Sequence, residues 1–225
     1  TLIEGDKEAG LSIFWADDGL DTGPILLQKK APLGPNDTLD SIYNSFLYPE
    51  GIKAMAEAVN LVATGKAPKI PQPTEGATYD PMLNKKDLQK IDLSKSAVQI
   101  HNFIRGLDSA PGAWTIINGE EVRLYGSTVW TSPKPDGEVV DVDGQPGIVH
   151  DTGLVISAAC GGFVNVEKLK IGSRTMLASN FGKADEGVAN VDFTEEERNA
   201  VEVMKDIWEN ILNVEVDEDT DFFAC

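Results

Sequence analysis

Cysteine, histidine and basic residues are all scarce in this sequence. Its 225 residues include two cysteines and two histidines, and 19 lysines and arginines stand against 37 aspartates and glutamates. Because Cys160 and Cys225 lie far apart, the sequence indicates no disulfide framework and favours a reducing, cytoplasmic location. The acidic excess predicts that nucleic acid is not a partner, since a nucleic-acid surface needs net positive charge.

Long hydrophobic runs are also missing. No segment approaches the ~20 consecutive apolar residues of a membrane-spanning helix, so the sequence predicts no membrane association. No secretory leader is recognisable, and the chain begins at Thr1 without an initiator methionine. We interpret these ends as those of a fragment of a longer protein.

The charges divide the chain into three parts. Residues 1–82 carry 6 basic and 12 acidic side chains, residues 83–190 carry 11 and 13, and residues 191–225 carry 2 and 12. Four prolines between Ala67 and Pro81 predict an extended linker after the first part. We therefore predict domains over residues 1–82, 83–190 and 191–225.

The first part shows an α/β pattern. Apolar runs predict strands at residues 11–16 and 24–29. Asp37 is expected to cap a helix that continues to Gly65 with an interruption at Pro49. The pattern is too short for a complete α/β sheet, because parallel strands need crossover connections.

The second part is rich in short strands. It begins with a helix whose apolar face is expected to contain Val98, Ile100, Phe103 and Ile104. Strand-like runs separated by Gly, Pro or Asp then cover residues 113–118, 121–130, 147–150, 153–159 and 163–171. Regular short strands of this kind predict a small OB-like antiparallel barrel.

The third part begins with an amphipathic helix over residues 192–212. Thr194 and Glu197 have the spacing of a capping box. An apolar stripe follows at helical spacing, formed by Val201, Met204, Ile207, Trp208 and Ile211.

The candidate site is the loop "ADDGLDTG" between the two strands of the first part. Its aspartates, Asp17, Asp18 and Asp21, could hold a metal, act in catalysis or form a plain turn. Metal binding is not predicted, because the spacing lacks the alternating oxygen ligands and closing glutamate of a calcium loop. A plain turn accounts for Gly19 and one aspartate and leaves the third carboxylate redundant.

The loop and its flanks resemble the folate-dependent formyltransferase family. The similarity comprises "GDKEAGLSIF" before the loop and the ending Leu20-Asp21-Thr22-Gly23, which matches the family's Leu-Asp-x-Gly. The family runs from glycinamide ribonucleotide and methionyl-tRNA formyltransferases to the hydrolase domain of 10-formyltetrahydrofolate dehydrogenases. Its catalytic aspartate works with a histidine and an asparagine, which would lie upstream of Thr1.

The rest of the chain resembles the dehydrogenase branch of this family. The similar phrases are "FWADDGLDTG", "LYPEGIKAM", "EGATYD", "IHNFIRG", "PGAWT" and "TDFF". The resemblance implies the C-terminal half of a Rossmann-like formyltransferase domain, then its barrel-like C-terminal domain, then the first helix of an acyl-carrier-like domain. The serine that carries 4′-phosphopantetheine in such a domain would follow Cys225.

The resemblance also implies an activity. The enzyme would remove the formyl group of 10-formyltetrahydrofolate and, when complete, oxidise it to carbon dioxide with NADP. The NADP and 4′-phosphopantetheine sites would lie outside this chain, and the complete enzyme is expected to form a homo-oligomer. The alternatives are formyl transfer to methionyl-tRNA and a non-catalytic fragment that binds a partner through its acidic tail.

Within the loop, the resemblance makes Asp21 the catalytic carboxylate. A carboxylate beside a histidine can orient and activate the attacking water. The folate-binding loop would comprise Trp15, Ala16, Asp17, Asp18, Gly19, Leu20 and Asp21. Gly19 and Gly23 would let the backbone approach the flat pteridine ring, while Asp17 and Asp18 are interpreted as solvated or turn-capping groups.

Other conspicuous side chains are assigned to structure. His101 is interpreted as a structural histidine at a domain contact. Trp114, Tyr125 and Trp130 are interpreted as barrel packing, because no basic groove accompanies them.

Overall fold

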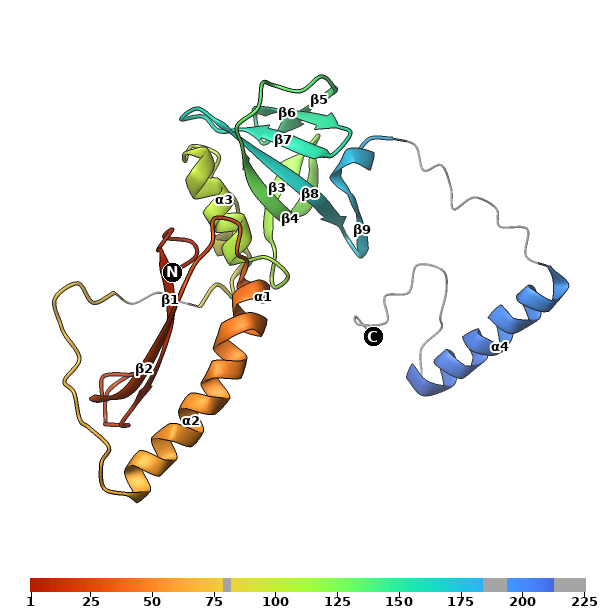
Figure 1. The fold of residues 1–225 in the computed structure, drawn as a ribbon. Coiled ribbons are helices and arrows are strands. Elements are labelled where there is room, and N and C mark those ends of the chain that lie inside the picture. The colour runs from red at the N-terminus through yellow and green to blue at the C-terminus, as the bar shows by residue number, and fades with distance from the viewer. Residues whose placement is uncertain (79–81, 184–193, 213–225) are drawn as a thin grey trace.

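The computed structural model describes residues 1–78, 82–183 and 194–212. An antiparallel hairpin and a long helix make up the N-terminal region, residues 1–78 (Figure 1). A closed barrel and one helix make up the barrel domain, residues 82–183, and helix α4 (Glu195–Leu212) follows. None of the helices within these described ranges is long and apolar enough to span a membrane.

The hairpin consists of β1 (Glu8–Phe14) and β2 (Ile25–Pro32). Both strands were predicted, and they pair antiparallel from Glu8↔Pro32 to Phe14↔Ile25. Ala9 from the hairpin packs with Ile42 and Phe46 in a small buried cluster. No parallel strand pair occurs in the described part of this region, so the Rossmann-like α/β sheet stays a prediction.

A continuous helical rod follows the hairpin. It consists of α1 (Leu39–Ile42), a π-helical stretch (Tyr43–Leu47) and α2 (Tyr48–Ala63). The prediction that Asp37 caps it is wrong, because Thr38 does: its hydroxyl accepts from the Ser41 N–H at 3.1 Å, and the Ser41 hydroxyl accepts from the Thr38 N–H at 3.0 Å. The Asp37 carboxylate instead accepts from the N–H of Gly34 at 2.6 Å.

The π-helical stretch lets the rod continue past Pro49. Proline lacks an N–H, and its ring clashes with the carbonyl four residues earlier in a regular α-helix. Here the N–H of Tyr48 bonds to the carbonyl of Tyr43, five residues back, which widens the turn ahead of the proline. Pro49 then occupies the first turn of α2, so the expected interruption is a local widening.

Helix α2 turns its small residues inward and its large ones outward. Ala54 and Ala58 are buried. The large apolar residues at helical spacing are each at least 46% exposed; they are Tyr48, Ile52, Met55, Val59 and Val62. The apolar pattern that predicted the helix therefore lies mostly on a face that no described residue covers.

Six strands close into the barrel: β3 (Ala113–Ile117), β4 (Glu120–Trp130), β5 (Glu138–Val142), β6 (Gln145–His150), β7 (Gly153–Ser157) and β8 (Phe163–Ile171). They follow the order β4-β3-β5-β6-β7-β8, and the pairing of β4 with β8 closes the ring. Strand β9 (Arg174–Leu177) pairs antiparallel with the last residues of β8, from Lys168↔Leu177 to Ile171↔Arg174. The antiparallel barrel was predicted, but with five strands.

The prediction missed β5 and β9. Residues Asp143 and Gly144 connect β5 to β6 with φ angles of 48° and 83°, the left-handed geometry of a two-residue hairpin turn. An Asp-Gly pair between apolar runs is a hairpin signal, and it would have revealed β5. The sixth strand is what allows the sheet to close.

Helix α3 (Ala97–Gly106) packs against β4 and β8. Its core face consists of Ala97, Ile100 and Ile104, all at most 5% exposed, whereas Val98 is 54% exposed. The predicted face was therefore wrong at Val98, because a 3.6-residue period sets positions 97, 100 and 104 on one side and 98 on another. Short 3₁₀ turns at Lys86–Gln89 and Ala178–Asn180 complete the barrel domain.

The barrel aromatics lie outside the barrel interior. Trp114, Tyr125 and Trp130 are all partly exposed. The indole N–H of Trp114 donates to the carbonyl of Lys86 at 2.8 Å, and that of Trp130 donates to the carbonyl of Pro133 at 3.0 Å. They pack on the outer surface, and the buried core of the barrel domain is mainly aliphatic, with Phe181 as its aromatic member.

Helix α4 confirms the predicted C-terminal helix. Its apolar residues Val201, Met204, Ile207 and Ile211 are each at least half exposed. The side chain of Glu197, which the predicted capping box requires, and residues 213–225 lie outside the described residues. The acyl-carrier-like assignment therefore stays a prediction.

Candidate functional site

The candidate loop, residues 15–24, joins the two strands at the end of the hairpin remote from the barrel (Figure 1). The N–H of Trp15 donates to the carbonyl of Pro24 at 2.9 Å, which closes the loop at its base. Because β1 and β2 are antiparallel, this is a hairpin loop. Residues 16–22 are all exposed, and Trp15 is partly buried.

Asp17 folds the first half of the loop. Its carboxylate accepts from the N–H of Gly19 at 3.1 Å and from the hydroxyl of Thr22 at 2.8 Å. Aspartate commonly bonds backbone two residues on in this way and so makes a local turn. The Asp17 side chain therefore shapes the loop.

Position 23 requires glycine, because the backbone there passes very close to the backbone of Trp15. A Cβ atom built at Gly23 would overlap the carbonyl oxygen of Trp15, and one at Gly19 would overlap the hydroxyl of Thr22. Backbone cannot yield as a flexible side chain can. Gly23 therefore permits the loop to close on itself.

Asp21 has an unusual backbone conformation. Its φ angle is +55°, in the left-handed region that non-glycine residues rarely adopt. The side chain is exposed, and no described residue hydrogen-bonds its carboxylate. Left-handed aspartates also occur in ordinary turns, as at Asp143, so the catalytic role of Asp21 stays a prediction that rests on its motif.

A distant segment, residues 68–72, holds the loop. Ile70 exchanges two backbone hydrogen bonds with Ile25, at 2.7 and 3.0 Å. The indole N–H of Trp15 donates to the carbonyl of Pro68 at 2.8 Å, and the ammonium of Lys69 lies 5.0 Å from the Trp15 ring centroid. The first half of the predicted linker is thus bound to Trp15 and to Ile25, the first residue of β2.

Gln72 completes this attachment. Its amide nitrogen donates to the carbonyl of Asp21 at 2.8 Å and to that of Gly23 at 2.7 Å. Sequence reasoning missed Gln72, because it lies 51 positions from Asp21 in a proline-rich segment without a periodic pattern. Its position between Pro71 and Pro73 was the only sequence signal.

The structure brings Trp15, Asp17, Gly19 and Asp21 into one loop. Asp18 is exposed and Leu20 is 70% exposed, and no described residue donates to the Asp18 carboxylate. The loop therefore has seven consecutive exposed residues, 16–22, with the Asp21 carboxylate among them. Such a loop can read the edge of a flat heterocycle and place a carboxylate beside it.

His101 connects the two regions, as the sequence predicted. Its Nε2 lies 2.8 Å from the carbonyl oxygen of Pro35 and its Nδ1 lies 2.9 Å from the hydroxyl of Ser127. Because a carbonyl only accepts, Nε2 carries the proton and Nδ1 accepts from Ser127. The pKa of His101 is lowered, mainly by burial of the ring. The hydrogen bond to the carbonyl of Pro35 raises this pKa, and the positive charge of Arg105 lowers it further.

Arg105 makes the same connection. Its guanidinium donates to the carbonyls of Gly34 at 3.2 Å and Asp37 at 3.1 Å, and to the side-chain oxygen of Asn102 at 2.8 Å. Both Arg105 and His101 are at most 4% exposed. These side chains are therefore committed to the contact between the regions.

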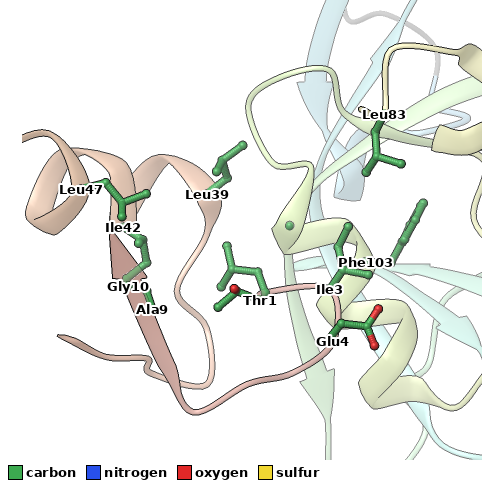
Figure 2. A pocket seen from close by; sticks show the side chains of 12 residues that line it. Thr1, Ile3, Glu4, Ala9, Gly10, Leu39, Ile42, Leu47, Leu83 and Phe103 are labelled. Atoms are coloured by element: carbon green, nitrogen blue, oxygen red, sulfur yellow. The ribbon is translucent and has the colours of Figure 1, made fainter. Parts of the chain in front are cut away.

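A hollow lies between the regions. It has a volume of about 410 Å³ and is bounded by the N-terminal residues, α1 and α3 (Figure 2). The side chains that line it are mainly apolar, including Ile3, Leu39, Ile42 and Phe103. It brings no group of converging polar side chains together, so it offers no chemistry comparable to that of the loop.

No cluster of three or more His, Cys, Asp or Glu side chains placed to hold a metal occurs in the described ranges. The Cys160 thiol is free and donates to the carbonyl of Ser94 at 2.8 Å.

Comparison with protein families matches both regions. Residues 1–59, which include the candidate loop, match the family described as "Formyl transferase". Residues 84–185, which include the barrel, match the family described as "Formyl transferase, C-terminal domain". The second match begins and ends close to the described barrel domain.

Curated relatives match along nearly the whole chain. A mitochondrial 10-formyltetrahydrofolate dehydrogenase of Homo sapiens is 52% identical over 99% of this chain and 24% of its own length. A cytosolic 10-formyltetrahydrofolate dehydrogenase of Xenopus laevis is 46% identical over 100% of this chain and 25% of its own length. The chain thus spans about a quarter of the length of the curated relatives it matches.

A solved structure shows the same fold. HypX from Aquifex aeolicus, in complex with tetrahydrofolic acid, superposes with a TM-score of 0.58 at 20% identity, over 80% of this chain and 30% of its own. The fold, the two domain matches and the identity to relatives along the whole chain agree. The chain belongs to the formyl transferase family, with parts of both the formyl transferase domain and its C-terminal domain.

Proposed function

We propose that this chain is part of an enzyme that binds 10-formyltetrahydrofolate through the loop from Trp15 to Asp21 and removes its formyl group. Two kinds of similarity support the substrate. The relatives that match 99% of the chain or more are named for 10-formyltetrahydrofolate, and HypX, which shares the fold, binds tetrahydrofolic acid. The proposed step adds water to the formyl carbon, breaks its bond to the folate nitrogen, which takes up a proton, and releases formate.

The observation that carries the proposal is the state of Asp21. Its backbone is held in a left-handed conformation while its carboxylate stays exposed and unpaired among the described residues. Asp18 is also exposed and unpaired, but among the loop's aspartates Asp21 is the one that combines a positive φ with the Leu-Asp-x-Gly ending of the family motif. We assign Asp21 as the catalytic carboxylate, which orients the water and stabilises a charged imidazole beside it.

The imidazole is proposed to come from outside these 225 residues. The two histidines of the chain, His101 and His150, both lie in the barrel domain. His101 is bonded to Pro35 and Ser127, and the Nε2 of His150 lies 2.9 Å from the side-chain oxygen of Asn165. The chain alone is therefore expected to release formate orders of magnitude more slowly than the enzyme that contains it.

The activity of the longer enzyme is inferred from its relatives. We propose oxidation of the formyl group to carbon dioxide with NADP, delivery on a 4′-phosphopantetheine arm and assembly as a homo-oligomer, with these cofactor sites outside the chain. Cytoplasmic location stays a prediction, because relatives named for the cytosol and for mitochondria are both similar.

Formyl transfer to methionyl-tRNA is the second candidate. Residues 83–190, which contain the barrel, carry 11 basic and 13 acidic side chains, which does not favour a tRNA surface. A non-catalytic fragment that binds a partner through residues 191–225 is the third. Assays of formate release with water and of transfer to methionyl-tRNA distinguish the three.

The experiment that tests the proposal replaces Asp21 in the longer enzyme. Asp21→Asn keeps the shape and removes the charge, so formate release should fall at least about a hundredfold while a folate analogue still binds. Asp18→Asn is the matched control, because Asp18 is an exposed carboxylate of the same loop, and it should keep most of the activity. Near-normal turnover by Asp21→Asn contradicts the assignment, as does equal loss in Asp18→Asn.

A further inference from the structure

The side chain of Gln72 reaches the candidate loop from a separate part of the chain. One amide nitrogen donates to two carbonyls, those of Asp21 at 2.8 Å and Gly23 at 2.7 Å. Both partners only accept, so the NH₂ group, with its two hydrogens, must face them. The two carbonyls therefore lie close together, on either side of Thr22.

The segment that carries Gln72 is stiff. Pro71 and Pro73 flank it, and proline fixes its own φ and restricts the residue before it to extended conformations. Ile70 is anchored on Ile25 by two backbone hydrogen bonds, at 2.7 and 3.0 Å. Gln72 is therefore presented to the loop from a fixed position.

The bonds from Gln72 act on the residue that bears the proposed catalytic carboxylate. Asp17 holds the first half of the loop through Gly19 and Thr22. In the second half, side-chain hydrogen bonds to the backbone at Asp21 and Gly23 come from Gln72. Loss of these bonds would free Asp21 to return to the common right-handed or extended backbone, and its carboxylate would point elsewhere.

We propose that Gln72 is a positioning residue for the formyl-removal reaction: by holding the carbonyls of Asp21 and Gly23, it fixes the direction of the Asp21 carboxylate. The inference rests on the proposed function of Asp21. A displacement of about 1 Å in a reacting group can cost on the order of a hundredfold in rate. Gln72 is thus expected to affect turnover more than folate binding.

The test compares two glutamines of the same hairpin assembly in the longer enzyme. Gln72→Met keeps the length of the side chain and removes both donors. Gln28→Met is the matched control, because the Gln28 amide donates only to the hydroxyl of Ser12, at 2.9 Å, on the exposed strands. For each variant, kcat and KM for formate release, affinity for a folate analogue and the thermal midpoint are measured beside Asp21→Asn.

We expect Gln72→Met to lower kcat by about tenfold to a hundredfold, with folate affinity within about threefold and a thermal midpoint no more than a few degrees below that of Gln28→Met, because two carbonyls lose their donor. A purely structural role would lower affinity and thermal midpoint together with kcat. Hydrogen exchange of residues 15–24 in the 225-residue chain should rise in Gln72→Met and not in Gln28→Met, independently of activity.

Three outcomes overturn the inference: unchanged kcat, affinity reduced as much as kcat, or unchanged exchange in the loop. The inference and the proposed function fail separately. If Asp21→Asn is inactive while Gln72→Met is fully active, only the role of Gln72 is wrong. If Asp21→Asn keeps its turnover, the assignment of the catalytic carboxylate is wrong.

Discussion

The barrel domain and the N-terminal region are stabilised in different ways. In the barrel, one continuous cluster of mainly aliphatic side chains fills the interior, and Leu124, Leu154 and Leu169 have 0% exposure. In the N-terminal region, the buried cluster is confined to Ala9, Ile42 and Phe46 with a few partly buried neighbours. The large apolar side chains of α2 meanwhile lie exposed.

The difference shows what fixes the geometry of each region. Burial of one Leu side chain stabilises by about 1.5–3 kcal/mol, whereas one hydrogen bond contributes about 1 kcal/mol net. The barrel can rely on packing. The candidate loop instead depends on specific polar contacts, from Asp17, Gln72 and the indole of Trp15. The region that carries the proposed chemistry is therefore the one with less packing, as is common for functional loops.

Cutting the chain between the two regions is the largest change and tests their independence. The sequence predicts cleavage between Lys66 and Lys86, and docking of residues 68–72 narrows this window to residues 73–86. An unspecific protease should cut there first and release a barrel fragment that still unfolds cooperatively. Mass spectrometry and thermal unfolding of the fragment check this. First cuts within residues 68–72 or inside the barrel would contradict the comparison.

A core truncation should separate the two regions in stability. Leu124→Ala removes a side chain with 0% exposure and should lower the free energy of unfolding of the barrel by about 2–5 kcal/mol. Met55→Ala on α2 removes one that is 54% exposed and should cost less than about 0.5 kcal/mol. Urea denaturation of both variants measures this. Equal losses would mean that α2 is covered in solution.

Removal of Arg105 should uncouple the regions. Arg105→Met keeps much of the packing but leaves the carbonyls of Gly34 and Asp37 without their donor, at a cost of about 1.5–3 kcal/mol. The control is Arg123→Met, because Arg123 donates to Pro111 and Gly112 within the barrel domain alone. Calorimetry should show a separate, earlier transition for Arg105→Met and a single shifted one for Arg123→Met. The reverse pattern would show that Arg105 does not join the regions.

Replacement of Thr115 is expected to raise the stability of the barrel. Its hydroxyl is buried in the barrel without a hydrogen-bond partner among the described residues. Thr115→Val keeps the shape and removes the unsatisfied group, so the free energy of unfolding should rise by about 1 kcal/mol. Thr128→Val, on a more exposed position of β4, should change it less. A destabilised Thr115→Val would indicate that the hydroxyl has a partner in solution.

Acidification should weaken the contact between the regions slightly. The folded-state pKa of His101 lies below its ordinary value of 6.5, so the unfolded chain binds the proton more readily. The contribution of neutral His101 is fully present above pH 6.5 and is lost as the pH falls toward the lowered pKa. Urea denaturation at pH 7.5 and 5.5 should show a smaller loss in His101→Gln than in the unchanged chain. The same loss in both would contradict this role for His101.

The local elements were largely readable from the sequence. Alternating apolar residues and turn dipeptides predicted most barrel strands, and helical periodicity predicted α2, α3 and α4, because these preferences act between residues a few positions apart. The assignment of residues Trp15 to Asp21 as the candidate site came from their motif and stays a prediction. The turn formed by Asp17 is equally local, since its partners lie within five residues.

Only the tertiary structure decided how these elements are used. The sequence did not indicate that Gln72 returns to Asp21 across 51 positions, that β4 meets β8 to close the ring, or that α2 exposes its larger residues. The sequence also did not indicate that Thr38, and not Asp37, is the N-cap of α1, because the Asp37 carboxylate accepts from the N–H of Gly34 instead. In each case the outcome depends on which distant segment occupies the neighbouring space, and local preference carries no information about that.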